Sequence, residues 1–172
     1  MNFEYKHLLP EDFSPKSKVW IYQSSRLLSL SEALNAEQEI NDFCASWTTH
    51  GSKVSAFGTL FFGQFVVLIS DDSTAPSGCS TDSSVRFVKE LGNQFNVDFF
   101  DRTTLAFIIK DKIQLLPLNQ LGYAVENKFL DAETLYFNNL VLNKEQLEND
   151  WIIPIKNSWL AKRLPKDEVT AN

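Results

Sequence analysis

The stretch VSAFGTLFFGQFVVLI (residues 54–69) holds two strands and the turn between them, and the rest of the chain is interpreted around it. Residues 54–62 have the β-branched and aromatic composition typical of a strand. Gly63-Gln64 places glycine at the first central position of a type II′ turn, which predicts a hairpin. The returning run, residues 65–69, is continuously apolar, as expected of a strand in the middle of a sheet or covered on both faces.

Two elements are predicted before this hairpin. Residues 1–17, with two prolines and mixed charge, indicate an extended arm that leads into a strand over residues 18–23. Ser29 and Glu32 have the spacing of a capping box, which opens a helix. Gly51 is the expected C-terminal stop of this helix. The apolar positions of the helix fall on one face; they are Ala33, Ala36, Ile40, Phe43, Cys44 and Trp47.

After the hairpin, SGCSTDSS (residues 77–84) is predicted to be a loop that precedes a second helix. The apolar stripe of that helix is Val85, Val88, Leu91 and Phe95, and Thr81 or Ser83 is the expected cap. Strands are expected from about 104 to 109 and again up to Pro117, and helices over 119–126 and 143–150. Residues 165–172 are polar and are expected to be a frayed tail.

The order strand, helix, strand, strand, helix, strand is that of a split βαβ, or ferredoxin-like, unit. We therefore expect an α+β fold: one antiparallel sheet with helices on one face, followed by a C-terminal extension. The length of 172 residues predicts a single domain over residues 1–172. A different antiparallel sheet with helices on one face would give the same order of elements.

Composition limits the class of function. A net charge of −6 argues against nucleic acid as a partner, because the chain would repel a phosphate backbone. The longest apolar run is far too short to span a bilayer, so no membrane segment is predicted. Two cysteines and no signal segment favour free thiols and a cytoplasmic location. The two histidines and two cysteines have no metal-binding spacing, so neither a metal nor another cofactor is expected.

The first candidate site is at the 77–84 loop. In the expected topology, Cys79 and Asp71 share one edge of the sheet with His50. A helix start lowers the pKa of a thiol and a nearby imidazole can take its proton, so Cys79 could be the nucleophile and His50 the base of a cysteine-dependent enzyme. The structural alternative is a small buried cysteine beside a histidine that ends its helix. Neither a phosphatase loop nor a paired-cysteine redox motif is present.

In a second interpretation the same loop binds an anion, and Cys79 is not a nucleophile. The backbone N–H groups at a helix start bind phosphate, sulfate or carboxylate, and small polar residues add further donors. The candidates for such binding are Gly78, Ser80, Asp82, Ser83 and Ser84. The leading hypothesis is therefore a small-ligand binding or interaction domain whose partner is a small molecule or a protein. The same residues are also those that a tight loop and helix cap require.

Two further groups of residues each have a functional and a structural interpretation. Arg26 and Arg102, with Ser24, are a possible oxyanion site at the opposite edge of the sheet, since paired guanidinium groups bind planar oxyanions. Asp101 could instead pair with either arginine at the surface. The four tryptophans could line a ligand pocket, although such residues more often fill a core; they are Trp20, Trp47, Trp151 and Trp159.

Five segments together resemble an uncharacterised family of small bacterial proteins: SGCSTDSSVRF (77–87), WTTHG (47–51), FFDR (99–102), FNN (137–139) and the terminal Trp159. The likeness covers nearly the whole chain, and Gly-Cys-Ser-x-Asp-Ser-Ser is its most specific part. Some members are labelled ABC transporter ATPase. That label requires a Gly-x-x-x-x-Gly-Lys-Ser/Thr loop, and none of the six glycines here begins one. We therefore do not expect ATPase activity.

Overall fold

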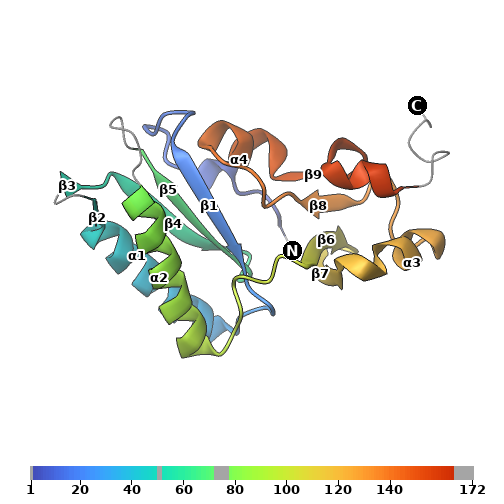
Figure 1. Cartoon of the computed structure of the whole chain (residues 1–172), viewed down its shortest axis with the longest axis horizontal. Coiled ribbons are helices and arrows are strands. Elements are labelled where there is room, and N and C mark those ends of the chain that lie inside the picture. Colours follow the sequence, from blue (N-terminus) through green and yellow to red (C-terminus); the bar gives the residue numbers. More distant parts are fainter. Residues whose placement is uncertain (1, 50–51, 72–77, 165–172) are drawn as a thin grey trace. The chain divides into compact units, whose positions relative to one another are not determined.

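The computed structural model describes residues 2–49, 52–71 and 78–164, and within these ranges the side chains of residues 49 and 78–80 are not described (Figure 1). The chain forms two compact units. The larger unit comprises Phe3–Asp101 and Asn139–Glu148. The smaller unit contains the described residues within Met1–Asn2, Arg102–Asn138 and Asn149–Asn172. The predicted tail, 165–172, lies outside the described residues.

The larger unit is built on a three-stranded antiparallel sheet. Its strands are β1 (Lys18–Gln23), β4 (Ala56–Phe61) and β5 (Phe65–Ser70), in the order β1-β5-β4. Every residue of β5 is buried, as its apolar run predicts for a central strand. A second, short ribbon pairs β2 (Thr48–Thr49) with β3 (Ser52–Lys53). The predicted hairpin is thus confirmed, and its second strand pairs with β1.

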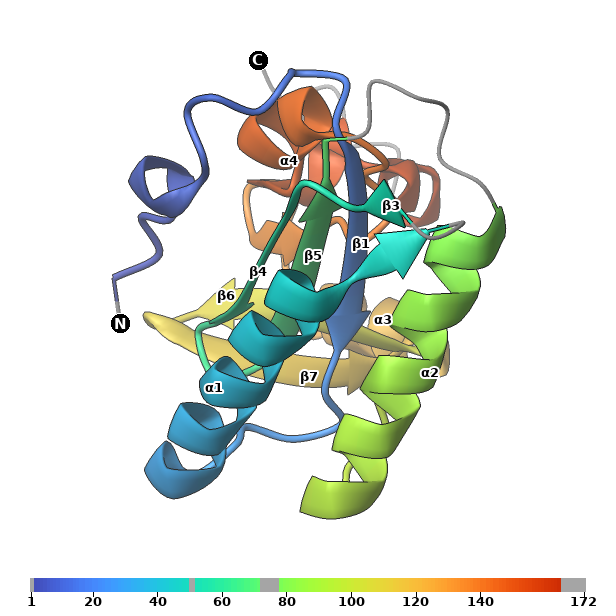
Figure 2. The same cartoon turned by 90° about the vertical axis from the view of Figure 1, so that its left-hand side faces the viewer.

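Two long helices pack on this sheet. Helix α1 (Leu30–Ser46) begins with the predicted capping box, in which the Ser29 side chain accepts from the Glu32 backbone and the Glu32 side chain accepts from the Ser29 backbone. Helix α2 (Gly78–Phe95) lies beside it (Figure 2). Both helices share one core with residues of all three strands; it includes Tyr22, Ala36, Ile40, Leu60, Val66, Leu68, Val88 and Leu91. Burial of these side chains is the main stabilising contribution.

The turn of the hairpin differs from the prediction by one residue. Gln64 N donates to Phe61 O at 3.0 Å, and the two residues between them, Phe62 and Gly63, have φ of 58° and 64°. Two positive φ values define a type I′ turn, whose twist matches the flanking strands, and not the type II′ turn expected at Gly63-Gln64. Strand β4 therefore ends at Phe61.

The edge of β1 opposite β5 is occupied by a segment from far along the sequence. Val19 N donates to Leu142 O at 3.0 Å, and Lys144 N donates to Ser17 O at 2.9 Å. Lys18 and Asn143 form an isolated antiparallel β-bridge. In a ferredoxin-like sheet this position belongs to the strand that follows the second helix. Here that strand, β6 (Thr104–Ile109), lies in the other sheet, so the fold is mixed α/β with two larger antiparallel sheets rather than one.

The N-terminal arm and helix α4 (Lys144–Asp150) are also part of the larger unit's structure, α4 through its first residues. The arm contains one short 3-10 turn, Lys6–Leu8. Tyr5 packs edge-on against Phe61, with ring centres 5.7 Å apart, and its hydroxyl donates to Leu147 O at 2.6 Å. The arm is therefore anchored to β4 and to α4.

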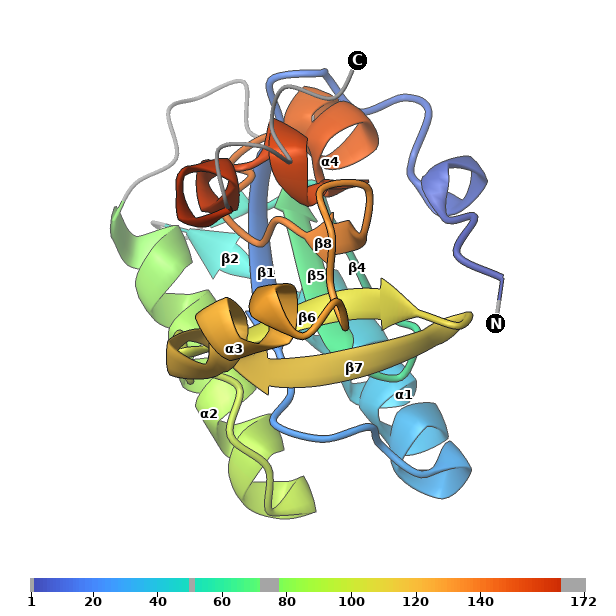
Figure 3. The same ribbon diagram turned by 90° about the vertical axis from the view of Figure 1, so that its right-hand side faces the viewer.

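The smaller unit has a four-stranded antiparallel sheet in the order β7-β6-β8-β9, of which Figure 3 shows β6, β7 and β8. Strands β7 (Lys112–Pro117), β8 (Leu135–Phe137) and β9 (Ile152–Pro154) join β6. Helix α3 (Leu121–Glu126) follows a 3-10 turn, Leu118–Gln120, and further 3-10 turns cover Ile155–Asn157 and Trp159–Arg163. A separate core holds this unit together and includes Phe107, Leu121, Tyr136, Ile155 and Leu160. In the part of the chain that the structure describes, no helix is both long and apolar enough to span a membrane.

Candidate functional site at the start of helix α2

The segment predicted to be a loop is mostly helical. Helix α2 begins at Gly78, so Gly78 to Ser84 form its first two turns and neither Thr81 nor Ser83 is its cap. Small polar residues are favoured at helix starts as well as in loops, because their side chains bond nearby backbone groups. Ser84 illustrates this: its Oγ donates to Thr81 O, one turn earlier, at 2.8 Å.

Ser84 is a core residue and not a surface ligand. Its side chain is fully buried, and its Oγ lies 2.9 Å from the Tyr22 hydroxyl of β1. The end of the Gly-Cys-Ser-x-Asp-Ser-Ser motif therefore attaches α2 to the sheet. Asp82, by contrast, is exposed, and Ser83 is half-buried.

Lys18, at the first position of β1, reaches the start of α2. Its ammonium group lies 3.5 Å from Thr81 Oγ1, which is in the first turn of the helix, and 5.0 Å from the centre of the Trp20 ring. Lysine over an aromatic face is stabilised by the ring's negative potential. Among the described residues, Lys18 forms no ion pair with a carboxylate.

Trp47 lies beside Trp20 and carries an unpaired hydrogen-bond donor. The two indole rings are 5.6 Å apart between centres, and Phe43 packs on the other side of Trp47 at 4.8 Å. Trp47 is only 2% exposed, and its Nε1–H has no hydrogen-bond acceptor among the described residues. Buried donors are nearly always paired, so this indole N–H is a donor available for an acceptor from outside the described residues.

Asp71, the acidic member of the predicted Cys79 site, is engaged by the N-terminal arm. Its Oδ1 accepts from Ser14 N at 3.1 Å and from the Ser17 hydroxyl. Its own backbone N–H donates to Ser55 O at 2.8 Å. The carboxylate thus holds the arm beside the end of β5.

The rest of the predicted catalytic group lies outside the described residues. This holds for His50 as a whole and for the side chain of Cys79. The side chains of Gly78 and Ser80, two of the predicted ligand-binding residues, are not described either. The described backbone places Cys79 as the second residue of an 18-residue helix. The pairing of Cys79 with His50 stays a prediction.

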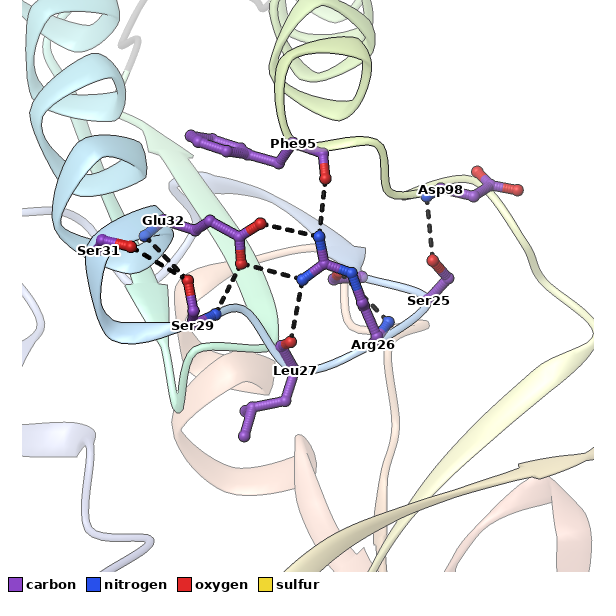
Figure 4. Close-up of polar contacts among 9 residues, drawn as sticks. Ser25, Arg26, Leu27, Ser29, Ser31, Glu32, Phe95 and Asp98 are labelled. Atoms are coloured by element: carbon purple, nitrogen blue, oxygen red, sulfur yellow. Dashed lines mark hydrogen bonds and ion pairs between the residues drawn. The ribbon is translucent and has the colours of Figure 1, made fainter.

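Arg26, from the second predicted site, already binds a carboxylate of its own chain (Figure 4). Its Nη1 donates to Glu32 Oε2 at 2.9 Å and its Nη2 to Glu32 Oε1 at 2.8 Å. Nη2 also donates to Phe95 O at 2.7 Å, which ties the loop before α1 to the end of α2. Arg26, followed by the Ser29 backbone and side chain, lowers the pKa of Glu32 to about 2.

The other members of the second predicted site are placed differently. Ser24 is fully buried, its N–H donates to Gln64 O at 2.8 Å, and its carbonyl accepts from the Gln64 side chain. Arg102 is exposed and belongs to the smaller unit. Its pairing with Arg26 stays a prediction.

Cys44 is a structural thiol. It is 8% exposed within the core between α1 and the sheet, and burial raises its pKa to about 12. Nor is a metal centre indicated: among the described side chains, no group of three or more His, Cys, Asp or Glu is placed to hold an ion.

No protein-family model, curated protein or solved structure matches the chain. The resemblance to the small bacterial family therefore stays a prediction, and the site must be interpreted from its own geometry.

Lys18 was missed in the sequence, although a signal for it exists. Lys18, Trp20 and Tyr22 alternate along β1, so a strand brings them to the same face, the one that packs against α1 and α2. A cation at one end of an otherwise apolar strand face is the feature that singles it out.

Proposed function

We propose that this chain is a small-ligand binding domain that takes an anionic group, a carboxylate or a phosphate, at the start of α2. The observation that carries the proposal is the position of Lys18, between the Trp20 ring and Thr81 of the first helical turn. An ammonium group held beside a helix start adds a full positive charge to the partial charge of the helix.

The helix contributes donors as well as charge. The N–H groups of the first three residues of an α-helix lack partners within it, and in α2 these residues are Gly78, Cys79 and Ser80. They form the Gly-Cys-Ser part of the motif, and glycine at the first position leaves the most room for an anion. The chain's own Asp82 is in the second turn and exposed, so it does not occupy the first-turn N–H groups.

The aromatic residues support a ligand larger than a bare ion. Trp20, Trp47, Phe43 and Phe87 form a continuous row, and the rings of Phe43 and Phe87 stack 4.3 Å apart. The unpaired indole N–H of Trp47 adds a further donor in this row. A ligand with an anionic group and an apolar or planar body would satisfy both parts of the site.

The alternative is a cysteine-dependent enzyme with Cys79 as nucleophile and His50 as base. One observation favours it: Cys79 is in the first turn of a long helix, where the helix charge stabilises a thiolate. The anion site does not need this chemistry, because its donors are Lys18 and the backbone.

A titration with inorganic phosphate, and a second one with acetate, tests the proposal. Binding is monitored by tryptophan fluorescence at low ionic strength. Trp20 and Trp47 lie at the site, so saturable quenching is expected, and Lys18→Gln should weaken binding about tenfold or more because it removes a charge-assisted contact. Lys89→Gln is the matched control, since Lys89 also lies over an aromatic ring, that of Phe100 at 6.0 Å, but on a later turn of α2. Equal affinities for the two variants would overturn the proposal.

A further inference from the structure

Strand β4 is the edge of the larger unit's sheet, and its outward-facing backbone groups are few. In an antiparallel pair, alternate residues point their N–H and C=O groups toward the neighbour and away from it. Asp71 N donates to Ser55 O, so the odd-numbered residues face β5 and the even-numbered ones face outward. Those outward residues within β4 are Ala56, Gly58 and Leu60.

Both ends of this edge are closed by the chain itself. Leu60 N donates to Glu37 Oε1 at 2.8 Å, and the Thr59 hydroxyl donates to the same oxygen at 2.9 Å. At the other end, Val54 N donates to Trp47 O at 2.9 Å. Ala56 and Gly58 are the outward residues whose N–H and C=O groups both have no partner among the described residues.

A groove leads to these groups. It has a volume of about 390 Å³ and lies between the edge, residues 53–58, and the residues Asn41, Cys44 and Ala45 of α1. Lys53 is the only charged side chain among the residues that line it. Ala56 is half-buried and Gly58 is buried in the single chain, and sheet edges with free backbone groups are the usual templates for pairing with another strand.

We propose that β4 pairs antiparallel with β4 of a second copy of this chain, about a twofold axis at Phe57. In this register Ala56 of each copy faces Gly58 of the other, and four backbone hydrogen bonds pair the N–H and C=O groups of these two residues. A register centred on Ala56 would set Gly58 against Val54, whose N–H is occupied. A register centred on Gly58 would set Ala56 against Leu60, which is also occupied.

Charge favours the same register. The register centred on Phe57 sets Val54 of one copy opposite Leu60 of the other. It therefore brings Lys53 of the first copy next to the Glu37 carboxylate that accepts from Leu60 N in the second. Lys53 is exposed, and neither it nor Glu37 forms an ion pair among the described residues. Glu37 uses only Oε1 in its contacts with β4, which leaves Oε2 for the ammonium group. A twofold axis repeats this pair on the other side, as an isologous interface requires.

Disulfide trapping tests the register. In a Cys79→Ser background, Phe57→Cys places two thiols across the axis, at a Cα separation of about 4.5 Å expected of a non-hydrogen-bonded pair, which a disulfide can bridge. Ser55→Cys is the control, since its two copies would be about 14 Å apart along the strands. A covalent dimer of the Phe57→Cys variant alone is expected. Equal cross-linking of both variants, or of neither, would overturn the proposal.

Sedimentation equilibrium of the unmodified chain gives an independent result. A concentration-dependent dimer is expected, and Ala56→Pro should raise its dissociation constant about tenfold or more, because proline removes an edge donor and no bond to β5. Circular dichroism checks that each variant is folded. A chain that stays monomeric up to near-millimolar concentration, or a dimer that Ala56→Pro leaves unchanged, would contradict the proposal. Neither experiment depends on anion binding.

Discussion

Tyr22 and Ser84 join the central sheet to the Gly-Cys-Ser-x-Asp-Ser-Ser motif through a buried hydrogen bond, with 2.9 Å between the two hydroxyl oxygens. Both side chains are buried, and Ser84 also donates to Thr81 O. The motif thus has two roles: its last serine anchors α2 to β1, and its first residues supply the helix start beside Lys18. Stability and binding should therefore respond to different residues of one segment.

A double-mutant cycle on Tyr22→Phe and Ser84→Ala measures the anchoring. Each single change is expected to lower the free energy of unfolding by about 1 kcal/mol, the usual net value of a buried hydrogen bond. The double mutant should lose less than the sum, with a coupling energy of about 0.5–1.5 kcal/mol, because both changes remove the same bond. Strictly additive losses in urea denaturation would show that the two hydroxyls do not interact.

The Arg26–Glu32 pair predicts a pH dependence. The pKa of Glu32 falls from 4.5 to about 2 on folding, chiefly through Arg26. A lowered pKa stabilises the folded state above pH 4.5, and this contribution is lost as the pH falls toward 2. Glu32→Gln should therefore melt at a lower temperature than the unchanged chain at neutral pH, and the difference should disappear near pH 2. A difference that is the same at both pH values would contradict this interpretation.

The two cysteines are expected to react differently with iodoacetamide. Burial raises the pKa of Cys44 to about 12, so in a Cys79→Ser variant alkylation should require unfolding. In the unchanged chain, a Cys79 that reacts only near its ordinary pKa of about 8.5 supports the binding domain. Rapid alkylation of Cys79 well below that pH, lost in His50→Ala, would instead support the enzyme.

Gly58 is expected to be intolerant of a side chain. A Cβ there would lie 2.6 Å from Ile40 Cγ2 and 2.8 Å from Cys44 Sγ, and both of these atoms are fixed close to the α1 backbone. Gly58→Ala should lower the free energy of unfolding by about 1–3 kcal/mol. Gly122→Ala is the control: no atom is within 4 Å of its Cβ, and alanine favours a helix by up to about 1 kcal/mol. Equal stability of the two variants would refute the close approach of α1 to β4.

Local sequence signals predicted much of the fold. The capping box of Ser29 and Glu32, the continuous apolar run of β5 and the strand predicted over residues 18–23 each depend on neighbouring residues, and the structure confirms all three elements. Strand β6 was predicted over 104–109 and is found there, but in a different sheet. Its expected place beside β1 is taken by Leu142 and its neighbours, about 120 residues away in sequence, and no local pattern encodes that choice.

The candidate site was predicted less completely. The sequence located the start of α2 within a few residues but described it as a loop, since Ser, Thr, Asp and Gly are common in both. Arg26 was predicted to bind a ligand, because the spacing of residues alone does not show that it forms an ion pair with Glu32 of the same chain. Lys18 was not predicted as a site residue, because its position beside Thr81 depends on how α2 packs on β1.

Backbone and indole N–H resonances measured by NMR during a phosphate titration test the central claim most directly. The amides of Gly78, Cys79 and Ser80 and the Trp47 indole N–H should shift together with a single dissociation constant, and the Lys18→Gln variant should raise that constant about tenfold or more. Shifts that are absent from the start of α2, or that persist unchanged without Lys18, would contradict an anion site there.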